Sequence, residues 1–518
     1  MASSTTPKKQ MQLNIIDNTA TGSHMAVGQW KDPNSMSRHK DRLEYYIWLA
    51  KMAEKGKITS IFFADLYGTH DVYGGNADAT FKGGLWVAML DPVVLISAMA
   101  QATKSISFAV TGSTSYLTPY ILARTWSSLD HVTNGRIGWN IVTSFGKSPA
   151  KCMGMEEAIP HDERYASAEE YTDLVYRLWE RSWEDGAQVW SSEPEAAYDP
   201  SKIHRIEFEG KYYKFSGYGQ THPSPQRTPA LFQAGASKAG IAFAGKHAEG
   251  IYCGVPTIPG LLAYSKSVRE AAVTAGRDPT TIKLFAGICP IVARTEEEAW
   301  EKHAKYKANT SVVGGLSSFC ALTGVDLSKY GLDEPFNFDD EDLQGAGIQG
   351  IFKNFKLVEK DKAWTPRMVG EKVGFGGFGP MPVGTPSQVA DVMEQWFTEA
   401  DIDGFNIQYM CNPESIEDLV ELLIPELQRR GLYRTEYPVV GGTFRENMQG
   451  KPGQSLLGTD HPGAKVRWNA QEEAIVEVEC TNGLKRPRQT HTVDMEGNKK
   501  IKVSNSNGLE KDTIVRVI

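Results

Sequence analysis

Short apolar runs alternate along this chain with longer amphipathic stretches up to about residue 440. The runs are rich in β-branched and aromatic residues, and most are apolar throughout rather than at every second position. Continuous apolar runs are typical of parallel strands that are buried on both faces. The predicted strands cover residues 12–17, 60–65, 105–114, 136–144, 229–235, 250–254, 283–293 and 404–410.

Helical periodicity occupies the stretches between these strands, and several stretches begin at a capping residue or a proline. The predicted helices cover 38–56, 92–104, 119–132, 167–184, 237–248, 295–308 and 386–400, with a last one near 415–431. Strands that each lead into a helix predict an α/β fold, a (β/α)8 TIM barrel. An open doubly wound sheet is the alternative.

Two connections are too long to be simple loops, and we expect insertions at 145–228 and 305–385 in a barrel domain 1–440. The second is rich in glycine. Its segment 374–384, with Phe375 and Phe378, predicts a hinged lid that seals a site from water, and a surface insertion is the alternative. Residues 441–466 are predicted to lie along the barrel surface. Residues 467–518 form a C-terminal extension of short strands or a tail.

Composition narrows the function classes. The net charge of -8 disfavours nucleic acid as a partner. No apolar run approaches the roughly 20 residues that a membrane helix needs, so no membrane association is expected. The N-terminus lacks a secretory pattern, and six cysteines are scattered without metal-ligand spacing. These observations predict a cytoplasmic protein without a metal site.

Candidate chemistry gathers where strands end and helices begin. Polar residues follow most predicted strands, and in a barrel they would converge on one mouth, although a single polar residue there is more often a helix cap. They are Asp17, Asp65, Thr111, Ser113, Ser115, Asn140, Thr143, Ser144, Ser237 and Gln408. His161, Arg164 and Tyr165 lie at the predicted start of one helix, and Gly235 and Ser237 lie at the predicted start of another. Helix starts that carry a cation, hydroxyls and free N–H groups favour a bound phosphate, so we expect a phosphate-bearing cofactor.

Other cofactor and hydrolase sites lack their minimum parts. The run AGASKAG is not GxGxxG and has no acidic partner about 20 residues later, which disfavours a dinucleotide site of the Rossmann type. The signatures of zinc hydrolases, serine hydrolases and P-loop proteins are absent from the sequence.

Several long motifs carry a family resemblance. They are FFADLYG (62–68), the stretch 108–144, HDERYASAEEY (161–171), GKYYKFSG (210–217) with PSPQRTPALFQAGASKAG and the residues after it up to 254, and 384–407. In this order they resemble the luciferase-like flavin monooxygenases over residues 10–465. The similarity is greater to the branch of nitrilotriacetate, EDTA and dibenzothiophene-sulfone monooxygenases.

The resemblance implies a two-component monooxygenase that inserts one oxygen atom from O₂ into a small organic substrate, such as an aminocarboxylate or a sulfone. It implies FMN, used as FMNH2 that a separate NAD(P)H:flavin reductase supplies. The cofactor-binding residues expected are Asp65, Thr111, Asn140, His161, Arg164, Tyr165 and Ser237. No catalytic side chain is assigned, and a homo-oligomer, dimer or tetramer, is expected. A deazaflavin-dependent hydride-transfer enzyme and a flavin-binding protein without turnover are the alternatives.

Overall fold

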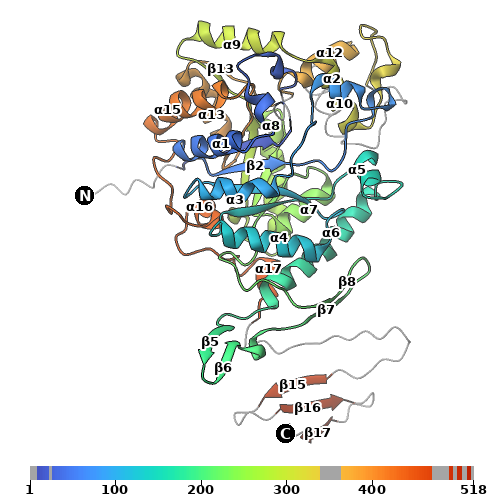
Figure 1. The fold of residues 1–518 in the computed structure, drawn as a ribbon, viewed down its shortest axis with the longest axis vertical. Coiled ribbons are helices and arrows are strands. Elements are labelled where there is room, and N and C mark those ends of the chain that lie inside the picture. Colours follow the sequence, from blue (N-terminus) through green and yellow to red (C-terminus); the bar gives the residue numbers. More distant parts are fainter. Residues whose placement is uncertain are drawn as a thin grey trace, which may run out of the picture. The chain divides into compact units, whose positions relative to one another are not determined.

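The computed structural model of the chain shows an α/β fold (Figure 1). It describes residues 9–20, 22, 26–338, 363–377 and 379–468, together with three strands beyond residue 488. The chain divides into two compact units, Met1–Val466 and Arg467–Ile518.

The first unit is built on a closed barrel of parallel strands in the order β1-β14-β11-β10-β9-β4-β3-β2. Its strands are β1 (Gln12–Asn18), β2 (Ser60–Ala64), β3 (Ser107–Ser113), β4 (Ile137–Val142), β9 (Ala230–Gln233), β10 (Gly250–Cys253), β11 (Lys283–Ile288) and β14 (Gly404–Ile407). Each predicted strand contributes to this barrel, so the (β/α)8 prediction is confirmed and the open sheet is wrong. Pairing of Gln12 with Gly404 closes the ring.

Helices on the outside of the barrel cover the strands and bury the main hydrophobic core between the two layers (Figure 1). They are α1 (Leu43–Lys55), α3 (Val93–Gln101), α4 (Pro119–Val132), α6 (His161–Tyr176, continued by a π turn at Arg177–Arg181), α7 (Lys238–His247), α8 (Ile258–Thr274), α13 (Pro386–Glu399), and α14 (Glu414–Asp418) with α15 (Ile424–Arg429), joined by a π turn at Leu419–Leu423. Helix α8 was missing from the predicted set. Its sequence begins with Ile-Pro-Gly, although Thr257 caps it by accepting a hydrogen bond from the Gly260 N–H.

The run 283–293 is not one strand. It divides into β11 and β12 (Ile291–Val292), and β12 leaves the barrel to pair with β13 (Val383–Gly384). Short 3-10 turns lie at Gln29–Lys31, Met36–His39, Tyr73–Gly75, Pro200–Lys202, Pro279–Thr281 and Leu327–Lys329.

The first long connection, 145–228, contains α5 (Lys147–Cys152), the barrel helix α6, and two hairpins, so it is only partly an insertion. The hairpins pair β5 (Gln188–Ser192) with β6 (Glu195–Tyr198), and β7 (Ile206–Glu209) with β8 (Lys214–Gly217).

The second connection follows α9 (Glu296–Ala308) and carries α10 (Val312–Thr323) and α12 (Pro366–Gly374), whose small core also includes Phe336 and Trp364. Helices α10 and α12 touch through glycine, because a Cβ on Gly315 would lie 2.0 Å from the carbonyl oxygen of Gly370. Helix α2 (Asp78–Gly83), from the β2–α3 connection, packs on α10.

Part of the segment 441–466 is buried rather than on the surface. Its helices are α16 (Phe444–Gln449) and α17 (Pro462–Lys465). Phe444 and Met448 join the inner barrel cluster, and the Phe444 ring lies 5.0 Å from that of Phe232. The backbone N–H of Phe444 donates to the carbonyl oxygen of Gly135, just before β4, so α16 closes the N-terminal end of the barrel.

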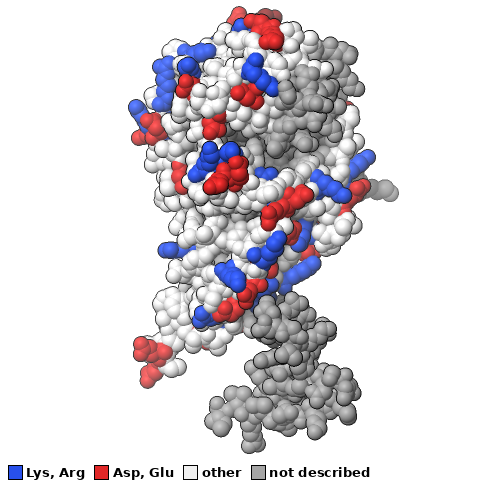
Figure 2. All heavy atoms as spheres, turned by 90° about the vertical axis from the view of Figure 1, so that its right-hand side faces the viewer, with Lys and Arg blue, Asp and Glu red and all other residues white. Residues whose placement is uncertain are grey.

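The second unit contains an antiparallel sheet of β15 (Gln489–Val493), β16 (Lys499–Ser504) and β17 (Glu510–Ile514). In the part of the chain that the structure describes, no helix is long and apolar enough to cross a bilayer. Acidic and basic side chains are interspersed on the face in Figure 2. The cytoplasmic location stays a prediction.

Candidate active site

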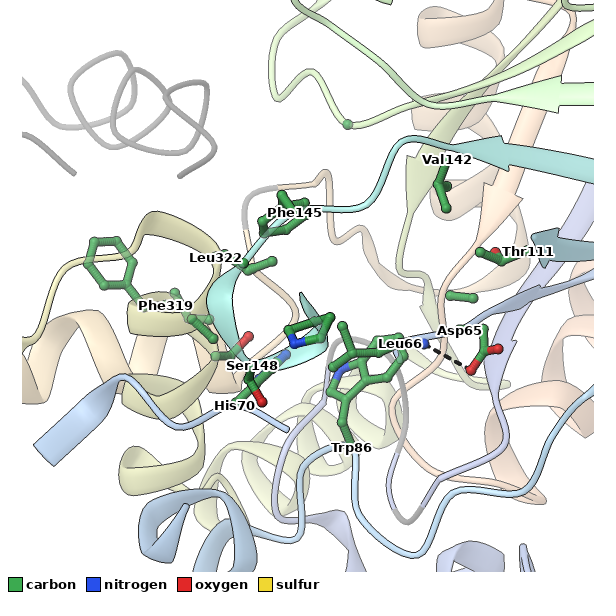
Figure 3. Close-up of a pocket in the computed structure, with 18 of the residues that line it drawn as sticks. Asp65, Leu66, His70, Trp86, Thr111, Val142, Phe145, Ser148, Phe319 and Leu322 are labelled. Atoms are coloured by element: carbon green, nitrogen blue, oxygen red, sulfur yellow. Dashed lines mark hydrogen bonds between the residues drawn. The ribbon is translucent and has the colours of Figure 1, made fainter. Parts of the chain in front are cut away.

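A cavity of about 410 Å³ opens at the C-terminal ends of the barrel strands. Strand ends supply its inner part: Ala64 is the last residue of β2 and Asp65 follows it, Thr111 lies on β3, Asn140 on β4, Gly287 on β11, and Gln408 follows β14. The mouth at this end of a barrel is where function is expected. In Figure 3, Asp65, Thr111 and Val142 lie on one side, and His70, Ser148 and Phe319 on the other.

The inner part carries hydrogen-bonding groups, some of them without a protein partner. Asn140 donates from Nδ2 to the Thr111 hydroxyl at 3.0 Å, and that hydroxyl donates to the carbonyl oxygen of Phe63 at 3.0 Å. The Asn140 Oδ1 and Gln408 Oε1 atoms are buried and accept no hydrogen bond from any described residue. Buried polar atoms are normally paired, so these two acceptors are available to a ligand donor.

Asp65 is the carboxylate of this inner part. Its Oδ1 accepts from the Leu66 N–H at 2.9 Å (Figure 3). Burial raises the pKa of its carboxyl to about 6, and the charge of Asp91 adds to the rise. A carboxyl with a raised pKa beside a cavity is typical of functional sites.

The outer part of the cavity is mainly apolar and comes from the connections rather than the strands. The β2–α3 connection contributes Val72 and Trp86, the residues around α5 contribute Phe145 and Pro149, and α10 contributes Phe319 and Leu322. Four uncharged polar residues, Thr69, His70, Ser148 and Ser318, also line this part, together with the charged Asp71 and Lys147. Both long connections therefore shape the site.

A second group of predicted residues lies at the starts of α6 and α7. The His161 and Tyr165 rings are 5.2 Å apart. The Tyr165 hydroxyl lies against the start of α7, because a Cβ added at Gly240 would approach it to 2.8 Å. Ser237 caps α7 and accepts a hydrogen bond from the Gly240 N–H at 3.1 Å. Helix α7 begins where the sequence predicted it, whereas α6 begins at His161, six residues before the predicted stretch 167–184, and so includes the residues expected at a helix start.

Arg164 connects this group with the cavity wall. It donates from one terminal nitrogen to the carbonyl oxygen of Ser144, next to the lining residue Phe145. Its Nε has no partner among the described residues, and burial lowers its pKa. The guanidinium therefore has donor capacity left for an anion.

The seven predicted cofactor residues thus form two sets. Asp65, Thr111 and Asn140 line the cavity, whereas the other four surround the two helix starts and are not part of its lining. Their convergence on a single mouth is therefore only partial in this structure.

Asp17, at the end of β1, belongs to neither set. Its carboxylate accepts from the Lys40 ammonium at 2.6 Å and from the Tyr45 hydroxyl at 2.8 Å, all buried. The Tyr409 hydroxyl donates to the same carboxylate at 2.5 Å. The Asp17 carboxylate therefore has a structural role.

The glycine-rich lid residues fall differently from the prediction. Phe375 packs against a buried cluster that contains Tyr306 and Met410, and its ring contacts that of His303 at 5.0 Å. Val373, Gly377 and Gly379 line the cavity instead. Phe378 lies outside the described residues.

The family model of the luciferase-like monooxygenases matches residues 18–404. The chain belongs to this family. That confirms both the resemblance and the prediction of a monooxygenase-type enzyme.

Individual relatives place this luciferase-like monooxygenase more closely. It is 40% identical over 459 residues to the long-chain alkane monooxygenase of Geobacillus thermodenitrificans, covering 89% of this chain and 98% of the relative. It is 34% identical to nitrilotriacetate monooxygenase component A of Aminobacter aminovorans, with 85% and 96% covered. A crystal structure of riboflavin lyase with modified FMN and riboflavin superposes with a TM-score of 0.80 at 34% identity, covering 89% of this chain and all of the other.

The residues of this monooxygenase fit FMN. The inner cavity offers two buried acceptor atoms without partners, Asn140 Oδ1 and Gln408 Oε1, which suit a ring N–H such as that of an isoalloxazine. The helix starts offer backbone N–H groups and the unpaired Arg164 Nε, which suit a phosphate.

Sequence reasoning did not single out the outer lining. His70, Ser148, Phe319 and Leu322 lie in connections that have no strand-end position to mark them. Gln408 was noted at a strand end and does line the cavity.

Proposed function

We propose that this protein is the oxygenase component of a two-component monooxygenase that uses reduced FMN. The observation that carries the proposal is the cavity at the strand ends, whose inner polar part carries two unpartnered buried acceptors. When bound, reduced FMN supplies the electrons that activate O₂, so that one oxygen atom enters the substrate and the other leaves as water.

Thr111, Asn140, Gln408 and Asp65 would hold and orient the flavin ring. Asp65 can also hold a proton at its carboxyl, because a pKa of about 6 leaves a minor protonated fraction at neutral pH. Arg164, Tyr165, His161 and the α7 start capped by Ser237 would bind the phosphate. The apolar outer wall would exclude water from the reacting atoms.

A separate NAD(P)H:flavin reductase would supply the reduced flavin. None of the eight barrel strands is followed directly by a GxGxxG turn, so the barrel offers no recognisable pyridine-nucleotide site. The relative from Aminobacter aminovorans is itself named as a component, which supports the same division of labour.

The first test is the affinity for FMN, measured by quenching of flavin fluorescence. Replacing Arg164 by alanine should raise the Kd for FMN about tenfold or more, since hydrogen bonds to charged groups are worth about 1.5–3 kcal/mol. Arg177→Ala is the matched control, because Arg177 extends the same helix but pairs with Asp173. Equal affinities for the two variants would remove the phosphate assignment.

The second test is oxygen uptake with an added flavin reductase and candidate substrates, followed by product mass. A product heavier by one oxygen atom supports the monooxygenase. FMN binding without any product would support a flavin-binding protein without turnover, and binding of a deazaflavin in place of FMN would support a hydride-transfer enzyme.

A further inference from the structure

An imidazole lies in the mainly apolar outer wall of the cavity. His70 lines the cavity with 8% of its surface exposed, and its ring lies 6.3 Å from that of Trp86. Its Nδ1 is buried and makes no hydrogen bond to any residue that the structure describes. A buried ring nitrogen without a partner destabilises the protein, unless a ligand supplies the missing partner.

The segment that carries His70 is held from two sides. The Thr80 hydroxyl donates to the carbonyl oxygen of His70 at 2.5 Å and also contacts the Ser317 hydroxyl on α10. On the other side, the Thr69 N–H donates to the Ser148 hydroxyl on α5 at 3.1 Å. The backbone at His70 is therefore held between the two long connections (Figure 3), so the unpaired nitrogen of its side chain is not the result of a loose loop.

The ring is neutral in this position. Burial lowers the pKa of His70 to about 4. A neutral imidazole has one donor and one acceptor nitrogen, so it can pair with an uncharged hydroxyl, carbonyl or amide group.

The charges around the cavity disfavour an anionic ligand. Among the lining residues, Asp65 and Asp71 are acidic, and the ammonium of Lys147 is paired with Glu157. A carboxylate in the apolar outer part would lose its hydration and meet no free cation of the described lining. A molecule with several carboxylates therefore does not suit this wall.

We propose that the substrate is a small, uncharged, largely apolar molecule with one hydrogen-bonding group, and that His70 is the specificity-determining residue that recognises that group. The inference rests on the proposed function, because it leaves the inner part of the cavity to FMN. Of the substrates that the family resemblance implied, this inference favours a sulfone-like compound over an aminocarboxylate. An alcohol-like compound would fit equally well.

The test uses the full chain loaded with oxidised FMN, so that no turnover occurs, and three probes of similar size. Benzyl alcohol has one hydroxyl, ethylbenzene has none, and benzoate is an anion. Equilibrium dialysis at pH 7.5 gives the Kd of each probe for the wild type and for His70→Phe and His70→Asn. Phe319→Leu is the control, because it trims the same wall without changing a polar group.

Replacing His70 by phenylalanine should weaken benzyl alcohol relative to ethylbenzene by about fivefold or more, the effect of removing a buried hydrogen-bond partner. His70→Asn keeps an uncharged donor and acceptor, and should preserve the wild-type ratio within about twofold. Phe319→Leu should weaken both neutral probes alike. Benzoate should bind at least about tenfold more weakly than benzyl alcohol to the wild type.

An unchanged ratio in His70→Phe, or benzoate that binds as tightly as benzyl alcohol, would overturn the proposal. The FMN affinity of each variant separates this outcome from a failure of the proposed function. If His70→Phe loses FMN while the probe ratio stays constant, the imidazole serves the flavin and the monooxygenase assignment stands. If the wild type does not bind FMN, the proposed function fails whatever the probes show.

Discussion

Replacing Asp65 by asparagine should stabilise the FMN-free protein more at neutral pH than at acidic pH. Asparagine retains the side-chain oxygen that accepts the Leu66 N–H. The pKa of the Asp65 carboxyl rises on folding from 3.8 to about 6, so the folded state binds the proton more tightly than the unfolded state. The free energy of unfolding is therefore not reduced by this carboxyl at low pH, and it falls as pH rises from about 4 to about 6.

The magnitude follows from the size of the shift. Two pKa units at about 1.36 kcal/mol per unit give a loss of about 2–3 kcal/mol at pH 7.5 for the wild type. Unfolding entropies of about 2.1 cal/mol/K per residue give about 1 kcal/mol/K for the unit Met1–Val466. Because roughly a third of this loss is already present at pH 4.5, Asp65→Asn should raise Tm by about 2 °C more at pH 7.5 than at pH 4.5.

Differential scanning calorimetry of the FMN-free protein at the two pH values measures this difference. Asp71→Asn is the control, because Asp71 lines the same cavity but is exposed. This variant also removes one negative charge, but the charge that it removes is not buried. If Asp65→Asn changes Tm equally at both pH values, the carboxyl is not destabilised by burial and the reasoning fails. The same variant should bind FMN more weakly than the wild type, the usual cost of relieving a strained site.

Three further predictions concern parts of the molecule away from this carboxyl. Arg445 is buried and donates to both oxygens of Glu249 at 2.7 and 2.9 Å. Arg445→Ala should therefore destabilise the protein by about 3–5 kcal/mol, measured as a lower Tm. An unchanged Tm would show that the ion pair contributes nothing to stability. A chain that ends near Ala470 should still fold and bind FMN, and loss of FMN binding would show that the C-terminal extension supports the site. The purified protein should not consume NADH or NADPH, followed at 340 nm, until a flavin reductase is added, and rapid consumption by the protein alone would contradict the two-component proposal.

The barrel could be predicted from the sequence because its signal is local. Each parallel strand is buried on both faces and therefore reads as a continuous apolar run, such as SIFFA in β2. The run 283–293 misled because the residues of β12 are as buried and apolar as those of β11, although they pair outside the barrel. Pro290, which lies between the two strands, is the signal in the sequence that separates them, because proline cannot donate to a central ladder.

The site could be predicted only in part, because polar residues at strand ends have several uses. Asp17 and Asp65 both end apolar runs in the sequence. In the structure Lys40 forms an ion pair with Asp17, whereas Asp65 lines the cavity. That difference depends on the fold around α1, which brings a lysine 23 residues away into contact. His70 and Phe319 enter the cavity from connections whose paths no periodic pattern describes.

The closure of the barrel also has a consequence for synthesis of the chain. Strand β1 pairs with β14 from Gln12–Gly404 to Ile15–Ile407, so its second partner is among the last barrel residues to be made. Until then the growing sheet ends in two open edges, with unpaired N–H and C=O groups that can join other chains. Phe444 and Arg445, which complete the N-terminal end of the barrel, arrive later still. Pairings so distant in sequence form slowly, so we expect the barrel to stay open, with its sheet edges prone to aggregation, until β14 has been synthesised.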